Sequence, residues 1–111
     1  QGCHLEVLKV DSCENLKNLY CGYNKLTNLN LWGTVNLQNL NMDNNNIKTM
    51  IISKLPSLLS LFCSDNNMTT LGVLNCDALM DLVCSYNNLT SLDLSGTDKL
   101  TFVDCSYNDK S

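Results

Sequence analysis

Residues 78–98, ALMDLVCSYNNLTSLDLSGTD, contain one complete copy of the pattern from which the fold of this chain can be predicted. Its first half spaces its apolar residues as L-x-x-L-x-C-x-x-N-x-L, from Leu79 to Leu89. Within that half, Leu82 and Cys84 flank Val83, which is the period of a half-buried β-strand. We therefore predict one short strand here, with Leu82 and Cys84 facing the core and Val83 facing outward.

The second half of the stretch almost repeats the first half. Leu89, Leu92 and Leu94 keep the same spacing, and Thr97 takes the place of the asparagine. A helix would need apolar residues at i, i+3, i+4 and i+7, whereas this half carries small and alternating residues and ends near a turn-like Ser-Gly pair. We predict a second, weaker strand or extended segment there.

The same pattern recurs along the whole chain with a period of 21 residues. Complete copies occupy residues 15–35, 36–56, 57–77 and 78–98, and partial copies occupy residues 1–14 and 99–111. Because one repeat cannot bury its own apolar face, the copies must stack on one another. We predict a single domain, residues 1–111, folded as a flattened, mostly-β solenoid with little helix, and we expect the array to be cut at both ends.

The composition argues against several classes of function. Seven basic and eleven acidic residues give a net charge of -4, and no arginine is present, whereas nucleic-acid binding normally needs a basic face. No apolar run approaches the roughly 18 residues that suggest a transmembrane helix, so we expect no membrane insertion within this chain. Because the chain begins at Gln1 without a signal-like segment, we interpret it as a mature or excised fragment.

Residues for catalysis are also scarce. The single histidine is His4, and no carboxylate pair, glycine-rich phosphate loop or nucleophile motif stands out. We therefore expect neither an enzyme nor a bound cofactor.

One asparagine recurs at the end of every predicted first strand. The column consists of Asn24, Asn45, Asn66, Asn87 and Asn108. A short amide side chain can satisfy backbone groups inside a turn, both of its own repeat and of its neighbours. We predict a structural asparagine ladder along the solenoid.

Most of the seven cysteines are explained by their position in the repeat. One inward column contains Cys21, Cys63, Cys84 and Cys105, with Met42 in the remaining slot. Since methionine replaces cysteine there, the site needs a soft apolar side chain. We predict structural buried free thiols in this column.

Two other roles for the cysteines are less favoured. Parallel stacked side chains suit the disulfide torsion poorly, and Cys13 and Cys76 lie three repeats apart. Cys3, His4 and Cys13 could in principle share a zinc ion, but their spacing is undistinguished. We expect no metal site.

The outward positions of the first strands are free for recognition. Candidate binding residues on this sheet are Tyr20, Leu59, Phe62, Met80, Val83 and Phe102, and those on the rim are Tyr23, Tyr86 and Tyr107. Apolar and aromatic residues edged by acids are typical of a protein-binding surface. The alternative is that these side chains only cover the sheet by stacking across repeats or face a self-assembly partner.

Two functions stay open at this stage. The first is a non-catalytic module that recognises a protein or glycan through the outward aromatic face. The second is a passive spacer, or a stalk that self-associates through uncapped ends, because repeat arrays normally need polar caps.

The segment CSYNNLTSLDLSGT, residues 84–97, resembles the short-period leucine-rich repeats of secreted and surface proteins from gut Bacteroidetes and related bacteria. It is also similar to nested repeats, in which both halves carry a leucine motif. The resemblance implies a right-handed leucine-rich-repeat solenoid with a parallel sheet on the concave face and short extended segments on the convex face. It further implies an adhesion or capture role and a secreted or cell-surface location.

The sequence departs from that pattern at several places. Met42 replaces the column cysteine, residues 51–56 and 72–77 are irregular, and Lys110 stands where an inward leucine belongs. We therefore expect bulges on the convex side of the second and third complete copies and a frayed last repeat.

Overall fold

The computed structural model describes residues 7–9, 15–31 and 33–108, and these contain strands and turns but no helix. The strands are β1 (Val7–Lys9), β2 (Asn18–Tyr20), β3 (Asn28–Asn30), β4 (Asn39–Asn41), β5 (Thr49–Ser53), β6 (Ser60–Phe62), β7 (Thr70–Leu74), β8 (Asp81–Val83), β9 (Ser91–Asp93) and β10 (Phe102–Asp104). The prediction of a mostly-β chain is confirmed. Nor does the described chain hold any helix long and apolar enough to cross a bilayer.

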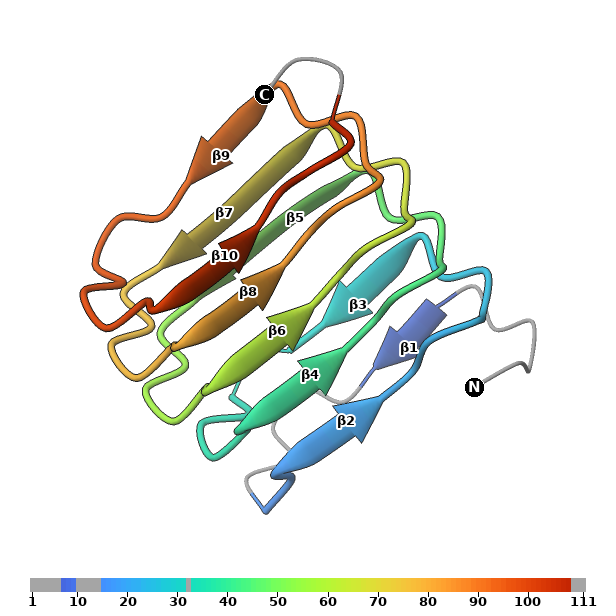
Figure 1. Ribbon diagram of the computed structural model, residues 1–111. Helices are drawn as coiled ribbons and strands as arrows, with labels where there is room; N and C mark the ends of the chain where they lie inside the picture. Colours follow the sequence, from blue (N-terminus) through green and yellow to red (C-terminus); the bar gives the residue numbers. More distant parts are fainter. Residues whose placement is uncertain (1–6, 10–14, 32, 109–111) are drawn as a thin grey trace.

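The strands form parallel sheets on two sides of a solenoid (Figure 1). The even-numbered strands make one five-stranded sheet in the order β10-β8-β6-β4-β2, which we call the first sheet. On the other side, β5-β7-β9 and β1-β3 make a three-stranded and a two-stranded sheet. Register partners such as Asn18 and Asn39, or Thr49 and Thr70, are one 21-residue repeat apart. One repeat therefore makes one turn of the solenoid, and the predicted second strand is present.

The bulges expected on the convex side of the second and third complete copies are wrong for the paired strands β5 and β7, which lie on the side of the solenoid opposite the first sheet, here called the second side. These are the two longest strands, and they pair continuously from Thr49 with Thr70 to Ser53 with Leu74. The irregular residues compensate for each other, because the side chain of Ile51 lies over Gly72. A Cβ on Gly72 would come 2.9 Å from Cδ1 of Ile51. Among the described strands, the pairing is instead interrupted between β3 and β5.

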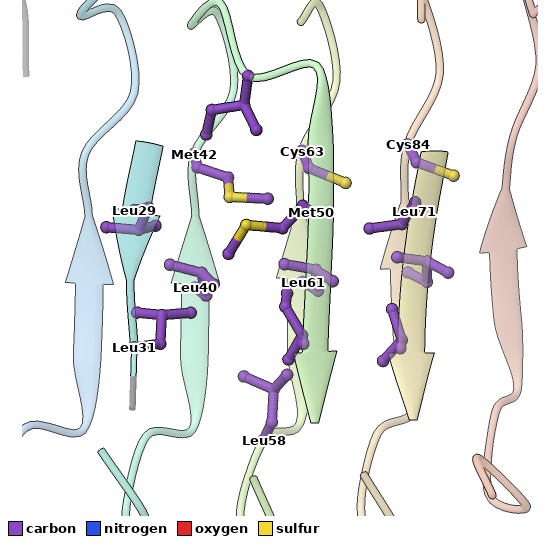
Figure 2. Packing of buried hydrophobic residues seen from close by; sticks show 14 of the residues in the cluster. Leu29, Leu31, Leu40, Met42, Met50, Leu58, Leu61, Cys63, Leu71 and Cys84 are labelled. Atoms are coloured by element: carbon purple, nitrogen blue, oxygen red, sulfur yellow. The ribbon is translucent and has the colours of Figure 1, made fainter. Parts of the chain in front are cut away.

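The core lies between the two sides and consists of stacked columns of apolar side chains. Leu40, Leu61 and Leu82 point inward from the first sheet and are at most 1% exposed. Figure 2 shows Leu61 and Leu40 among side chains from the opposite side, including Met50 and Leu71. Since burying one leucine stabilises a fold by about 1.5 to 3 kcal/mol, the columns hold the turns together.

Two columns of residues in the left-handed conformation reverse the chain direction. Where the first sheet ends, these residues are Tyr23, Asn44, Asp65, Tyr86 and Tyr107, with φ between 56° and 59°. On the other side they are Gly33, Lys54, Asn75 and Gly96. Gly96 needs to lack a side chain, because a Cβ there would lie 2.7 Å from Oδ1 of Asn75. The first of these columns places the rim tyrosines on an exposed corner.

Candidate binding face

The asparagine column lies in the turns that follow the first sheet, and each central member joins adjacent turns. The side-chain amide of Asn66 donates to the carbonyls of Cys63 and Ser64 in its own turn, at 3.2 Å each. It also donates to the carbonyl of Met42 in the preceding turn at 3.1 Å, and its Oδ1 accepts from the backbone N–H of Ile47 at 3.1 Å.

The same four types of contact recur at Asn45 and Asn87. Asn108 repeats them at the last described turn, while Asn24 donates to two carbonyls of its own turn. These turns form a regular edge, and in the described part of the chain every buried side-chain polar atom has a hydrogen-bond partner. That edge positions the ends of the first-sheet strands.

The thiol column is buried except at its last member. Cys21, Cys63 and Cys84 are free and at most 3% exposed. Burial raises the pKa of Cys21 to about 11, that of Cys84 to about 12, and that of Cys63 well above its usual value. Cys105 is also free but only half-buried, which corrects the expectation for this residue. Cys105 follows β10, and in the described part of the chain β10 pairs only with β8, so no described strand stacks on its other side.

The structure adds one thiol to the buried core. Cys76 is free and fully buried in the turn column of the second side. No cluster of three or more His, Cys, Asp or Glu side chains able to hold a metal occurs among the described residues. The sequence-based zinc alternative at Cys3, His4 and Cys13 lies outside those residues.

The candidate binding residues of the first sheet differ in their exposure. Leu59, Met80 and Phe102 are 39%, 44% and 53% exposed. Phe62 and Val83 are only half-buried rather than freely exposed, because each lies mid-sheet between register neighbours on both sides. We call these five residues the apolar patch. It covers β6, β8 and β10 and the residues that precede β6 and β8.

Tyr20 does not belong to the apolar patch, although it is 59% exposed. It lies on β2, and Asn41 on β4 separates it from Phe62. Apart from Tyr20, the β2 and β4 part of the face is polar. There the amide of Asn39 donates to Oδ1 of Asn18 at 2.7 Å, and the hydroxyl of Ser60 donates to Oδ1 of Asn39 at 2.7 Å.

That hydrogen-bonded ladder was not predicted from the sequence. Its signal was the column Asn18, Asn39 and Ser60, one repeat apart, since side chains at this spacing stack across parallel strands. The face therefore has a polar half on β2 and β4 and an apolar half on β6, β8 and β10.

The rim tyrosines are divided in the same way. Tyr86 and Tyr107 stack with ring centroids 4.4 Å apart and an interplanar angle of 6°, and both are more than half exposed. The pKa of Tyr86 is raised, first because the local surroundings remove solvent from its hydroxyl and then because Tyr107 and nearby carboxylates disfavour the phenolate. Tyr23 is exposed, but Asn44 and Asp65 separate it from this pair in the turn column. Only two of the three tyrosines thus extend the apolar half.

The geometry defines this chain as a mostly-β solenoid with one repeat per turn. No protein-family model matches the sequence, and neither a curated protein nor a solved structure is significantly similar to it. Any assignment of function therefore rests on the arrangement of its own residues.

Proposed function

We propose that this chain is a non-catalytic recognition module that binds a protein or a glycan through the apolar patch. The observation that carries the proposal is the exposure of Leu59, Met80 and Phe102 around the half-buried side chains of Phe62 and Val83. Exposed apolar side chains gathered in one place mark interaction sites more often than isolated ones do. Methionine and aromatic residues are moreover enriched in protein interfaces.

The rigidity of the face supports the proposal. The strands of the first sheet keep one register throughout, and hydrogen bonds of the asparagine ladder link the adjacent turns that follow these strands. A partner would then bind a preformed surface, so less conformational freedom would be lost on binding than for a flexible loop.

The same proposal assigns the chain to the nested type of leucine-rich-repeat proteins, in a bacterial secreted or cell-surface protein. Its support is the repeat motif together with two inward leucine-type columns per turn. An adhesion or capture role follows from that assignment.

The proposal is tested by replacing exposed patch residues only. We expect Met80→Ser combined with Phe102→Ser to weaken binding to a panel of extracellular matrix proteins and glycans at least tenfold, about 1.4 kcal/mol. Val35→Ser is the matched control, because Val35 is 44% exposed but lies in a turn outside the patch. If the wild-type chain binds a member of the panel and the double variant binds it equally well, the proposal is refuted. Phe62 and Val83 are poor choices here, since their half-burial couples them to stability.

A second candidate function is a structural spacer or self-associating stalk segment. It is favoured by one observation: the core-column residues Leu92 on β9 and Val103 on β10 are 37% and 41% exposed at the edges of their sheets. Strand edges of this kind can pair with another chain. Sedimentation velocity at increasing concentration tests it, and a constant monomeric coefficient would argue against self-association.

A further inference from the structure

We propose that the apolar patch binds a basic, aliphatic segment of a partner protein, whose lysine or arginine side chains neutralise Asp81 and Asp104. This inference rests on the proposed recognition function and names the chemistry of its partner.

The apolar half of the face carries charge of one sign only. The three segments that build it and its rim, residues 59–65, 80–86 and 101–107, contain Asp65, Asp81 and Asp104 but no lysine or arginine. The nearest lysine in sequence is Lys99, which precedes β10 by three residues. A ligand that covers this half therefore contacts carboxylates of this chain, and these three segments supply no basic residue to neutralise them.

The carboxylates lie among the patch residues rather than around them. Asp81 is exposed on β8 and is the register partner of Phe102 on β10. Asp104 is the register partner of Val83. Oδ1 of Asp104 accepts from the hydroxyl and the backbone N–H of Ser106, at 2.6 and 3.1 Å, and these bonds lower the pKa of its carboxyl group. Asp104 thus remains ionised at neutral pH.

This placement constrains what can cover the patch. Removing a carboxylate from water without a countercharge is costly, so an uncharged or acidic partner would lose affinity at Asp81 and Asp104. A lysine or arginine can pack its aliphatic stem on Met80 or Phe102 while its charged end reaches a carboxylate. An arginine can in addition stack on exposed aromatic rings, and Phe102 and Tyr107 are both exposed.

Other classes of ligand fit these charges less well. An anionic membrane surface would be repelled by Asp81 and Asp104, and a neutral glycan brings hydroxyl groups but no countercharge. The observations therefore favour a protein segment in which basic and aliphatic residues lie side by side.

The test uses the intact chain and a random phage-displayed peptide library as the probe. We expect the selected peptides to combine lysine or arginine with aliphatic residues. A synthetic peptide from the selection should bind the wild-type chain, and its Kd should rise several-fold when salt is increased from about 0.05 M to about 0.5 M. The Kd should rise about tenfold for Asp81→Asn combined with Asp104→Asn.

Asp77→Asn combined with Asp93→Asn is the matched control for this double variant. It removes the same charge, and Asp93 accepts from Ser95 in the same way as Asp104 accepts from Ser106. Both control residues are exposed, and Asp93 lies on the opposite side of the solenoid. We expect the control to bind the peptide with a Kd within about twofold of wild type.

The outcomes separate this inference from the proposed function. The selected peptides could be neutral or acidic, and could lose binding to the variant with Met80→Ser and Phe102→Ser but not to the aspartate variant. That result would overturn the inference of a basic partner and leave the proposed recognition function standing. Binding of a neutral glycan that the aspartate variant keeps would do the same. Peptides that bind equally well after both pairs of substitutions would overturn both proposals.

Discussion

Replacing Asn66 with alanine tests whether the asparagine ladder holds adjacent turns together. Asn66 is 5% exposed, and its side chain takes part in four hydrogen bonds. The variant removes all four bonds but leaves the backbone in place. Because the left-handed residue that helps to shape this turn is Asp65, alanine at position 66 meets no special conformational demand.

The cost follows from what each partner retains. The carbonyls of Met42, Cys63 and Ser64 keep the donors from Asn45, Asn87 and the backbone N–H of Asn44. By contrast, the described structure gives the N–H of Ile47 no acceptor besides Oδ1 of Asn66. One buried N–H without a partner costs about 1 to 3 kcal/mol. We therefore expect Asn66→Ala to lower the free energy of unfolding by about 2 kcal/mol and the Tm by about 8 °C.

Chemical denaturation and thermal melting followed by circular dichroism measure this difference. Asn67→Ala is the control, because Asn67 is the adjacent residue and is exposed; its effect should stay within about 0.5 kcal/mol. Asn66→Asp provides a second comparison, since it keeps an acceptor for Ile47 but loses the donor to three carbonyls. If Asn66→Ala and Asn67→Ala had the same Tm, the role assigned to the ladder would be refuted.

Two further predictions concern the thiols and the turns. Burial raises the pKa of Cys84 to about 12 and that of Cys21 to about 11, from a usual 9.0. The folded chain therefore holds these thiol protons more tightly than the unfolded chain. This contribution to the free energy of unfolding is complete below about pH 9 and is lost as the pH rises toward 12. We expect the Tm to fall between pH 9 and 11 and to fall less steeply in Cys84→Ala; equal slopes would contradict burial of the thiol. Gly96→Ala should destabilise the chain by at least about 1 to 2 kcal/mol, because φ is +78° and the new Cβ would contact Asn75. Lys54→Gly, at the equivalent position with φ 58°, should be neutral or stabilising, and a tolerated Gly96→Ala would show that this turn is not left-handed in solution.

The repeat period carried most of the fold prediction. Parallel strands that stack in register must present the same column of side chains at each turn, so the 21-residue spacing of Leu61 and Leu82 already implied their pairing. Inward and outward faces followed from the alternation in each half-repeat. The candidate face was harder to predict, because the exposure of Phe62 or Val83 depends on the side chains beside it on neighbouring strands rather than on its own type.

The 21-residue repeat is sufficient to specify a mostly-β solenoid, since only stacked copies can bury two apolar columns that no single repeat can cover alone. The repeat pattern also specifies which positions face outward and which position in each turn an asparagine occupies. The three-dimensional structure was needed to show that Asn18, Asn39 and Ser60 form a hydrogen-bonded ladder on the polar half of the face. It also decided that Tyr86 and Tyr107 stack, that Cys105 is half-buried, and that Ile51 covers Gly72. These features arise from contacts between turns, where the identity of the neighbour, and not the repeat pattern, sets the packing.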